Sequence, residues 1–189
     1  MKIHFVNMPK GASKVNFILR FYFNIFRTWY LFNIKFYWVK YKGFVRVMAE
    51  TRFAKRNIEI GDRVQFGQFC SVSTDVIFGN NILIAGRVGF VGKNDHGYDV
   101  PGQYIWDGDR GQDGVTVVED DVWIGFSSTI IAGVTIGKGA IIAAGSLVNT
   151  NVPSCEIWGG IPAKKIKNRF ESEIDEKIHK TFLDNQNKK

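Results

Sequence analysis

Cysteine, histidine and long uncharged apolar runs are all scarce in this sequence, and each scarcity excludes a class of protein. The two cysteines are too few for the disulfide framework of a small secreted domain. Of the three histidines only His96 lies in the central part of the chain, so a zinc site built from three imidazoles is not expected. Lysine and arginine interrupt every apolar stretch near the N-terminus before it could cross a bilayer. No short apolar core with a cleavage site follows the charged start, so we expect no signal peptide and a cytoplasmic location.

Acidic residues are missing from the first 49 positions, which hold nine Lys or Arg, although the formal net charge of the 189-residue chain is only +7. The chain thus joins a basic arm to an acidic body. With 45% hydrophobic residues it can bury a sizeable core, and the length suits one domain with appendages. We expect no nucleic-acid partner, because the basic arm resembles no nucleic-acid-binding module.

The basic arm, residues 1–47, is also unusually aromatic. Arg20, Asn24, Arg27 and Lys35 recur at nearly helical spacing, which leaves an aromatic face opposite them. One interpretation places residues 15–46 on an anionic membrane surface, at the inner face of the cell membrane. The other lets the aromatics cap the end of the core or pack on a neighbouring subunit. The aromatic residues are Phe17, Phe21, Tyr22, Phe23, Phe26, Trp29, Tyr30, Phe32, Phe36, Tyr37, Trp38, Tyr41 and Phe44.

A six-residue repeat dominates the centre of the chain. Its guide positions are aliphatic or aromatic, and four residues after each guide comes a second small or aliphatic residue, such as Val64, Cys70 or Ser128. A period of six fits neither an amphipathic helix nor ordinary strand alternation and predicts a β-solenoid. If three repeats close one coil, residues eighteen apart stack at about 4.8 Å. The guides are Ile60, Phe66, Val72, Phe78, Ile84, Phe90, Val118, Ile124, Ile130, Ile136, Ile142 and Val148.

The repeat breaks between Phe90 and Val118, which predicts that residues 93–115 leave the solenoid as a long loop. Long excursions from a compact scaffold are usually functional or disordered, and the aromatic residues here favour a binding surface. The loop's candidate substrate contacts are Asn94, Tyr98, Tyr104 and Trp106.

Residues 48–169 resemble the hexapeptide-repeat acyltransferases, in particular the branch that acetylates sugars and antibiotics. The resemblance implies an all-β solenoid, a left-handed parallel β-helix over residues 48–168. It also implies a homotrimer with sites between subunits and acetyl-coenzyme A as co-substrate, with no metal. Residues 169–189 form the tail, in which Ser172 and Asp175 predict a capped helix whose apolar face includes Ile174, Ile178 and Phe182.

The segment Lys93–Asp99 resembles the family's loop in which a histidine next to the coenzyme thioester deprotonates the acceptor hydroxyl. His96 takes that position, and an imidazole can exchange protons near neutral pH. Asp95 or Asp99 could orient the imidazole. The alternative is a surface histidine that only anchors the loop.

The resemblance also assigns a coenzyme groove. Small residues there let the pantetheine arm approach the main chain, and Lys164 and Lys167 match basic positions near the nucleotide phosphates. Phe126 departs from the serine of galactoside-type members, and Asn149-Thr150 from a threonine and lysine. The expected contacts are Gly125, Phe126, Ser127, Ala143, Ala144, Asn149, Thr150, Lys164 and Lys167.

These features predict an acetyl-coenzyme A-dependent O-acetyltransferase that acts on a small or lipid-linked sugar in surface polysaccharide biosynthesis. Two alternatives stay open. One is an N-acetyltransferase of a nucleotide-linked amino sugar, and the other is a non-catalytic scaffold associated with the membrane.

Overall fold

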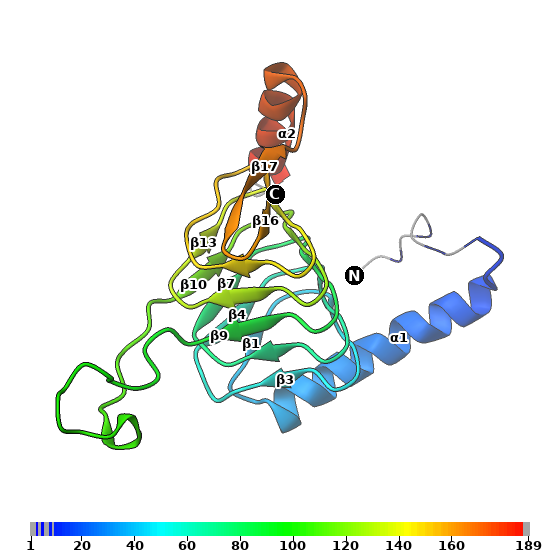
Figure 1. Cartoon of the computed structure of the whole chain (residues 1–189). Coiled ribbons are helices and arrows are strands. Elements are labelled where there is room, and N and C mark those ends of the chain that lie inside the picture. Colours follow the sequence, from blue (N-terminus) through cyan, green and yellow to red (C-terminus); the bar gives the residue numbers. More distant parts are fainter. Residues whose placement is uncertain (1–2, 4, 6–7, 9, 187–189) are drawn as a thin grey trace.

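The computed structural model of the chain describes residues 3, 5, 8 and 10–186. Three sheets enclose a triangular prism in this part of the chain, and all their strands pair in parallel except β17, which is antiparallel to β16 (Figure 1). The chain is a left-handed parallel β-helix, as predicted, with a helical N-terminal segment and a C-terminal helix. Sheet A comprises β1 (Lys40–Tyr41), β4 (Ile58–Ile60), β7 (Val76–Phe78), β10 (Thr116–Val118) and β13 (Thr135–Ile136).

The other two sheets complete each coil. Sheet B comprises β2 (Val45–Val47), β5 (Val64–Phe66), β8 (Leu83–Ile84), β11 (Trp123–Ile124) and β14 (Ile141–Ile142), and it ends in β16 (Glu156–Gly160) and β17 (Ala163–Asn168). Sheet C comprises β3 (Arg52–Phe53), β6 (Ser71–Val72), β9 (Gly89–Val91), β12 (Thr129–Ile131) and β15 (Leu147–Val148). We name the turns that join the sheets the A–B, B–C and C–A corners.

The predicted guide residues form the core. All twelve are at most 2% exposed, and the second register, including Cys70, Ser128 and Ser146, is buried as well. Four phenylalanines stack through the prism axis, because Phe53, Phe66, Phe78 and Phe90 meet edge to face with ring centroids 5.1–5.2 Å apart. Such pairs contribute about 0.5–1.5 kcal/mol each beyond their buried area.

The first coil begins before residue 48. Tyr41, Val47 and Phe53 continue the six-residue spacing upstream, but each lies nineteen residues before its partner in the next coil, as in the pair Tyr41↔Ile60. One additional residue between Phe53 and Ile60 therefore shifts the frame of the repeat. That shift conceals this coil when the repeat is counted in sixes from Ile60.

Two helical elements close the N-terminal end of the prism: α1 (Lys14–Tyr30) and the π-helical turn η2 (Leu31–Lys35). Phe32 and Phe36 are buried and pack against Phe53, so part of the aromatic arm caps the core. The Thr28 hydroxyl donates to the Val45 carbonyl and fixes α1 to the first coil. Figure 1 shows α1 extending past the edge of the prism.

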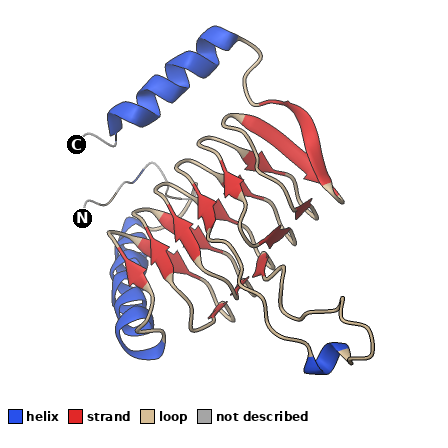
Figure 2. Cartoon of the chain, turned by 90° about the vertical axis from the view of Figure 1, so that its left-hand side faces the viewer, coloured by secondary structure: helices blue, strands red, loops and turns tan. Residues whose placement is uncertain are grey.

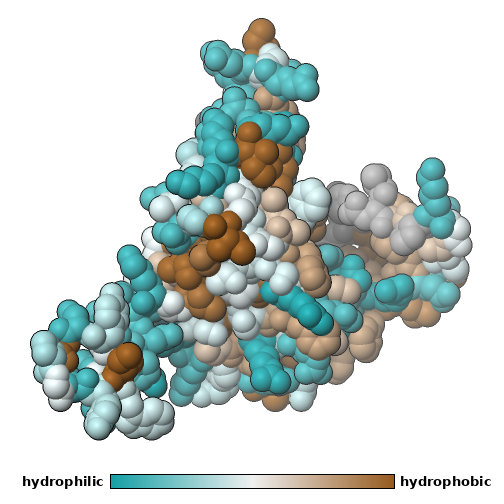
Figure 3. All heavy atoms as spheres, viewed as in Figure 1, coloured by the Kyte–Doolittle hydropathy of each residue, from teal (hydrophilic) through white to brown (hydrophobic). Residues whose placement is uncertain are grey.

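The C-terminal end carries the β16–β17 hairpin and α2 (Glu173–Gln186), which stands apart from α1 at the opposite end of the solenoid (Figure 2). Ser172 Oγ accepts the amide of Ile174 at 3.1 Å, so Ser172 caps the helix, whereas Asp175 makes no return hydrogen bond to Ser172 among the described residues. Leu183 is buried, whereas Ile174, Ile178 and Phe182 are 53–71% exposed, and hydrophobic residues are seen on the surface of this end of the molecule (Figure 3). The expected apolar face therefore does not pack across a coil of its own chain, and a neighbouring subunit remains its expected partner.

Candidate active site

The loop that carries His96 leaves the prism at the C–A corner after β9 and returns at β10. Apart from the short 3₁₀ turn η3 (Ile105–Asp107), it forms no helix or strand, and it stands away from the coils (Figure 1). We call the base of the loop, where its two ends meet at residues 93–94 and 111–113, the neck. Asp113 joins the two ends there, because its Oδ1 accepts hydrogen bonds from the amides of Lys93 and Asn94 at 3.0 Å each. The Gly111 amide also donates to the Asn94 carbonyl at 2.9 Å. Asp113 thus positions the segment that begins three residues before His96.

The His96 imidazole is half-buried, and its Nδ1 atom is shielded from solvent with no hydrogen-bond partner among the described residues. The adjacent Gly97 amide donates to the Asp109 carbonyl at 2.7 Å, which ties the two limbs of the loop together. A buried nitrogen without a partner costs about 1–3 kcal/mol. The Nδ1 atom is therefore suited to hydrogen-bond to a group that the described part of the chain does not provide.

The two carboxylates expected to orient His96 do not do so within the described part of the chain. Asp95 Oδ1 lies over Gly92, where a Cβ would come within 2.6 Å of it, and Asp99 is exposed. The aromatic candidates for substrate contact are also open to solvent, because Tyr98, Tyr104 and Trp106 are 81–88% exposed. Asn94 differs, since its amide group donates to the Gln112 carbonyl in the neck at 3.1 Å.

The predicted coenzyme residues nearest the C-terminal coils meet at the B–C corner. Gly125 and Ala144 occupy consecutive turns there, and a Cβ on Gly125 would lie 2.5 Å from the Ala144 amide nitrogen. Glycine is therefore required at position 125. Ser127, Ala143 and Ala144 line the same pair of turns, and Ala144 is exposed.

Phe126 is the aromatic departure from the family pattern in this corner. Its ring is 52% exposed, and the Arg87 guanidinium lies 5.9 Å from the ring centroid. The guanidinium is equally close to Phe69 in the coil below. An aromatic and cationic surface therefore adjoins the small-residue turns.

A β-bulge brings Lys164 and Lys167 to one face of the C-terminal hairpin. Lys167 pairs with Ile157 and Lys164 with Gly159, and the register shift passes over Ile166. Ile157 in turn pairs with Ile141, whose side chain points away from the core. Since cross-strand partners share a face, both lysines lie on the outer face of sheet B. Neither forms an ion pair within the described chain, so both cations are available to a phosphate.

Asn149 and Thr150 lie apart from this group. They are exposed in the C–A corner after β15, at the far end of the sheet C strand from Ala144 and two coils above the neck of the His96 loop. One chain therefore places the predicted coenzyme residues at two corners and on the C-terminal hairpin. No hydrogen bond within the described residues joins the His96 loop to the B–C corner.

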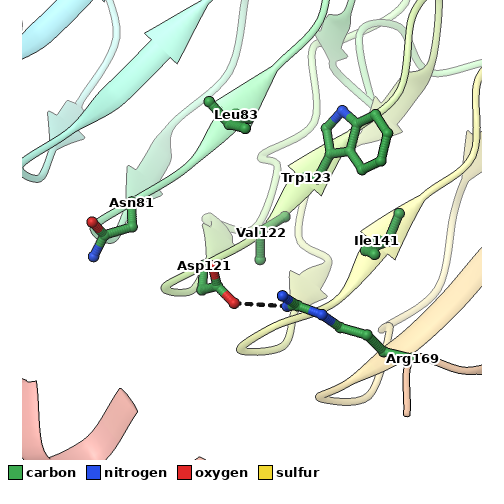
Figure 4. Close-up of a pocket in the computed structure, with 7 residues that line it drawn as sticks. All are labelled: Asn81, Leu83, Asp121, Val122, Trp123, Ile141 and Arg169. Carbon is green, nitrogen blue, oxygen red and sulfur yellow. Dashed lines mark hydrogen bonds and ion pairs between the residues drawn. The ribbon is translucent and has the colours of Figure 1, made fainter. Parts of the chain in front are cut away.

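A polar cluster at the A–B corner was not predicted from the sequence. Asp121 Oδ2 accepts from Arg169 Nη1 at 2.7 Å and lies 2.8 Å from His179 Nε2. Figure 4 shows this ion pair at the edge of a hollow of about 170 Å³ whose apolar wall includes Leu83 and Trp123. The partners are 48 and 58 residues apart, so no local pattern could predict them. The cluster fixes α2 to the solenoid.

No three His, Cys, Asp or Glu side chains are grouped to hold a metal ion in the described ranges. The repeats at residues 116–150 match the family model of the bacterial transferase hexapeptide with six repeats. These residues thus carry the repeat of the hexapeptide-repeat family. The fold and the repeat of the chain agree with the resemblance that the sequence indicated.

Several known proteins with related sequences are acetyltransferases, and another, 49% identical over 59 residues, is a mitochondrial gamma carbonic anhydrase of Arabidopsis thaliana. This hexapeptide-repeat chain is 37% identical over 120 residues to a chloramphenicol acetyltransferase of Klebsiella aerogenes, covering 59% of this chain and 54% of that protein. It is 38% identical over 130 residues to a probable macrolide acetyltransferase of Lysinibacillus sphaericus, covering 63% and 66%. The chain thus spans between half and two thirds of these relatives' lengths.

Among solved structures, the crystal structure of the polySia-specific acetyltransferase NeuO is similar, with a TM-score of 0.51 and 25% identity. The match covers 72% of this chain and 66% of the NeuO chain. The shared part is the solenoid fold.

Proposed function

We propose that this hexapeptide-repeat protein is an acetyl-coenzyme A-dependent O-acetyltransferase with His96 as general base. The observation that carries the proposal is the shielded Nδ1 atom of His96, which has no hydrogen-bond partner among the described residues and lies in a loop held by Asp113. The similarity to acetyltransferases of up to 38% identity supports the reaction class. Bound acetyl-coenzyme A would supply the activated acetyl group.

Different residues of the chain have different roles in this reaction. Neutral His96 accepts the proton of the acceptor hydroxyl as its oxygen attacks the thioester carbonyl, and the resulting imidazolium returns a proton to the departing sulfur. Main-chain amides near the loop or groove stabilise the charge that develops on the carbonyl oxygen. Lys164 and Lys167 hold the phosphates, and the turns at Gly125 and Ala144 admit the pantetheine arm.

A homotrimer with sites between subunits would complete this arrangement. The loop and the B–C corner carry complementary parts of the site but make no hydrogen bond within one chain's described residues. Sheet B also exposes an apolar column in which Leu83, Trp123 and Ile141 stack in register, and the first two are 52–53% exposed. We expect a neighbouring subunit to cover part of this column.

For the acceptor we propose a sugar hydroxyl of a surface polysaccharide or of its lipid-linked precursor. The polySia specificity of NeuO supports a glycan acceptor, and the exposed Tyr98, Tyr104 and Trp106 offer flat surfaces on which a sugar ring can stack. The acetylation of an amino sugar would use the same imidazole. The bond formed therefore has to be tested directly.

The test is the release of free coenzyme thiol from acetyl-coenzyme A with a panel of acceptors: oligosialic acid, nucleotide-linked amino sugars, chloramphenicol and a macrolide. We expect His96→Ala to lower the turnover about 10²–10⁴-fold while coenzyme binding, measured by calorimetry, is unchanged. Asp109→Asn, elsewhere in the same loop, is the matched control and should retain activity. Turnover by His96→Ala at the level of the parent chain would refute the catalytic role.

The chemical stability of the acetylated acceptor from this assay shows whether an oxygen or a nitrogen atom received the acetyl group. An acetyl ester is cleaved by mild alkali or hydroxylamine, whereas an acetamide survives both. We expect the acetyl group to be lost under these conditions. A stable product would assign the chain to N-acetylation.

A further inference from the structure

Helix α1 presents an apolar face that its own chain leaves uncovered. Its residues recur at spacings of three and four and so form one stripe along the helix, and every one of them is 45–65% exposed. The opposite side packs on the first coil, where Phe21 stacks on Phe44 and Thr28 is bonded to Val45. The apolar stripe is therefore not needed to cap the core. It consists of Val15, Leu19, Tyr22, Phe23, Phe26, Trp29 and Tyr30.

A basic concavity of about 230 Å³ lies beside this stripe, between α1 and the first two coils. Arg20 and Arg27 line it from α1, and Arg46 lines it from β2. Phe23 belongs both to the concavity and to the apolar stripe. The remaining lining residues, Asn24, Val47, Met48, Ala49 and Gln68, are all uncharged. We call this concavity the arginine pocket.

Nothing acidic neutralises the arginine pocket in the described part of the chain. Arg20 and Arg27 form no ion pair there, and Arg46 Nη1 donates to the neutral Gln65 side chain at 3.2 Å. Guanidinium groups bind phosphate oxygens through paired hydrogen bonds. Three guanidinium groups surround this one small hollow, and no carboxylate lines it. Its charge and its hydrogen-bond donors therefore suit a phosphate group.

We propose that the arginine pocket and the apolar stripe together form a docking surface for an anionic phospholipid membrane. The pocket takes the phosphate of a lipid headgroup, and the stripe enters the headgroup layer beside it. Tyr and Trp favour this depth, since their rings combine an apolar body with a polar tip. The described helices include none long and apolar enough to cross a bilayer. The chain would thus lie on the membrane with the prism directed away from it.

Charge favours a membrane over a second copy of the chain as the occupant. The first 49 residues contain nine Lys or Arg and no acid, and cytoplasmic leaflets carry a negative surface potential. A subunit contact through the same stripe would bury Arg20 and Arg27 next to it, at a cost in desolvation unless carboxylates met them. At a lipid surface both guanidinium groups stay hydrated or bind phosphate.

The test is flotation of the full chain with vesicles of phosphatidylglycerol in phosphatidylcholine and with phosphatidylcholine alone. We expect flotation with the anionic vesicles only. Arg20→Gln/Arg27→Gln removes two charges, each worth about 1 kcal/mol at the membrane surface, and should lower the partition coefficient about 30-fold. The matched control is Arg56→Gln/Lys177→Gln, which removes two exposed charges elsewhere and should stay within about twofold of the parent chain.

Further variants separate a built phosphate site from diffuse attraction. Arg20→Lys/Arg27→Lys keeps both charges but loses the paired geometry, so we expect weaker flotation than the parent shows. Leu19→Ser/Phe26→Ser changes only exposed positions and should abolish flotation while the chain stays folded. Thiol release with a soluble acceptor should be unchanged in all of these variants, so that failure here is distinct from failure of the proposed enzyme activity.

Three results would overturn the proposal. The first is a parent chain that does not float with anionic vesicles, or an Arg20→Gln/Arg27→Gln variant that floats equally well. The second is saturable binding of inorganic pyrophosphate, lost in the same variant, without any vesicle binding, which would assign the pocket to a free phosphate compound. The third is dissociation of an oligomer by Leu19→Ser/Phe26→Ser in sedimentation velocity, which would assign the stripe to a subunit interface.

Discussion

Replacing Asp113 by alanine should release the neck of the His96 loop. The carboxylate accepts two main-chain amides, those of Lys93 and Asn94, at 3.0 Å each, and no other acceptor for them is present in the described chain. A hydrogen bond to a charged group contributes about 1.5–3 kcal/mol when buried. Since this neck is partly exposed, we take about 1 kcal/mol for each bond. The closed form of the neck should then lose about 2 kcal/mol, or about 30-fold in population.

Hydrogen exchange on a peptide that contains residues 91–98 measures this change without knowledge of the acceptor. We expect these two amides to exchange about 30-fold faster in Asp113→Ala. Asp113→Asn keeps one oxygen acceptor and should recover part of the protection, and Asp109→Asn is the control within the loop. In turnover, Asp113→Ala should lower kcat with little change in the KM for coenzyme. Unchanged exchange in Asp113→Ala would refute the assignment of Asp113 as the residue that positions the loop.

Three further predictions concern the solenoid. Phe66→Ala removes a fully buried ring that contacts both Phe53 and Phe78 and should lower the free energy of unfolding in a denaturant titration by about 3–5 kcal/mol; a loss under 1 kcal/mol would contradict the axial stack. Burial raises the pKa of the Cys70 thiol, so alkylation by iodoacetamide at pH 7.5 should be far slower than for free cysteine, and an equal rate would contradict its core position. Burial alone would raise the pKa of Glu156, but hydrogen bonds from Lys165 and Trp158 lower it below its ordinary value of 4.5. The carboxylate therefore stabilises the fold above that pH and ceases to do so as the pH falls through the folded pKa, so thermal melts of Glu156→Gln should depend less on pH below 4.5 than those of the parent chain.

Much of the fold could be predicted from the sequence because the repeat is local. Each guide position depends on a six-residue period, and all twelve guides are buried as predicted. The first coil could not be found in this way, since one additional residue between Phe53 and Ile60 moves Tyr41 out of frame. A single insertion is enough to conceal a coil whose strands still pair in register.

Only part of the candidate site could be predicted from local sequence patterns. His96 and the coenzyme turns could be proposed from their segments, and their roles stay predictions. Asp113 lies in the same loop but acts on amides about twenty residues away, so its position in the sequence gives no signal of its function. The common face of Lys164 and Lys167 depends on a bulge, because a regular strand would direct side chains three residues apart to opposite faces. Both features depend on contacts between residues that are distant in the sequence, and the residue types along the chain do not specify those contacts.

Calorimetric titration of acetyl-coenzyme A into the full chain tests whether this solenoid binds the coenzyme. We expect saturable binding, and we expect Lys164→Gln/Lys167→Gln to weaken the affinity about tenfold or more through the loss of two phosphate contacts. Lys177→Gln, which removes an exposed charge from α2, should bind like the parent chain. The absence of saturable binding by the parent chain would contradict the assignment of this solenoid as an acetyl-coenzyme A-dependent enzyme.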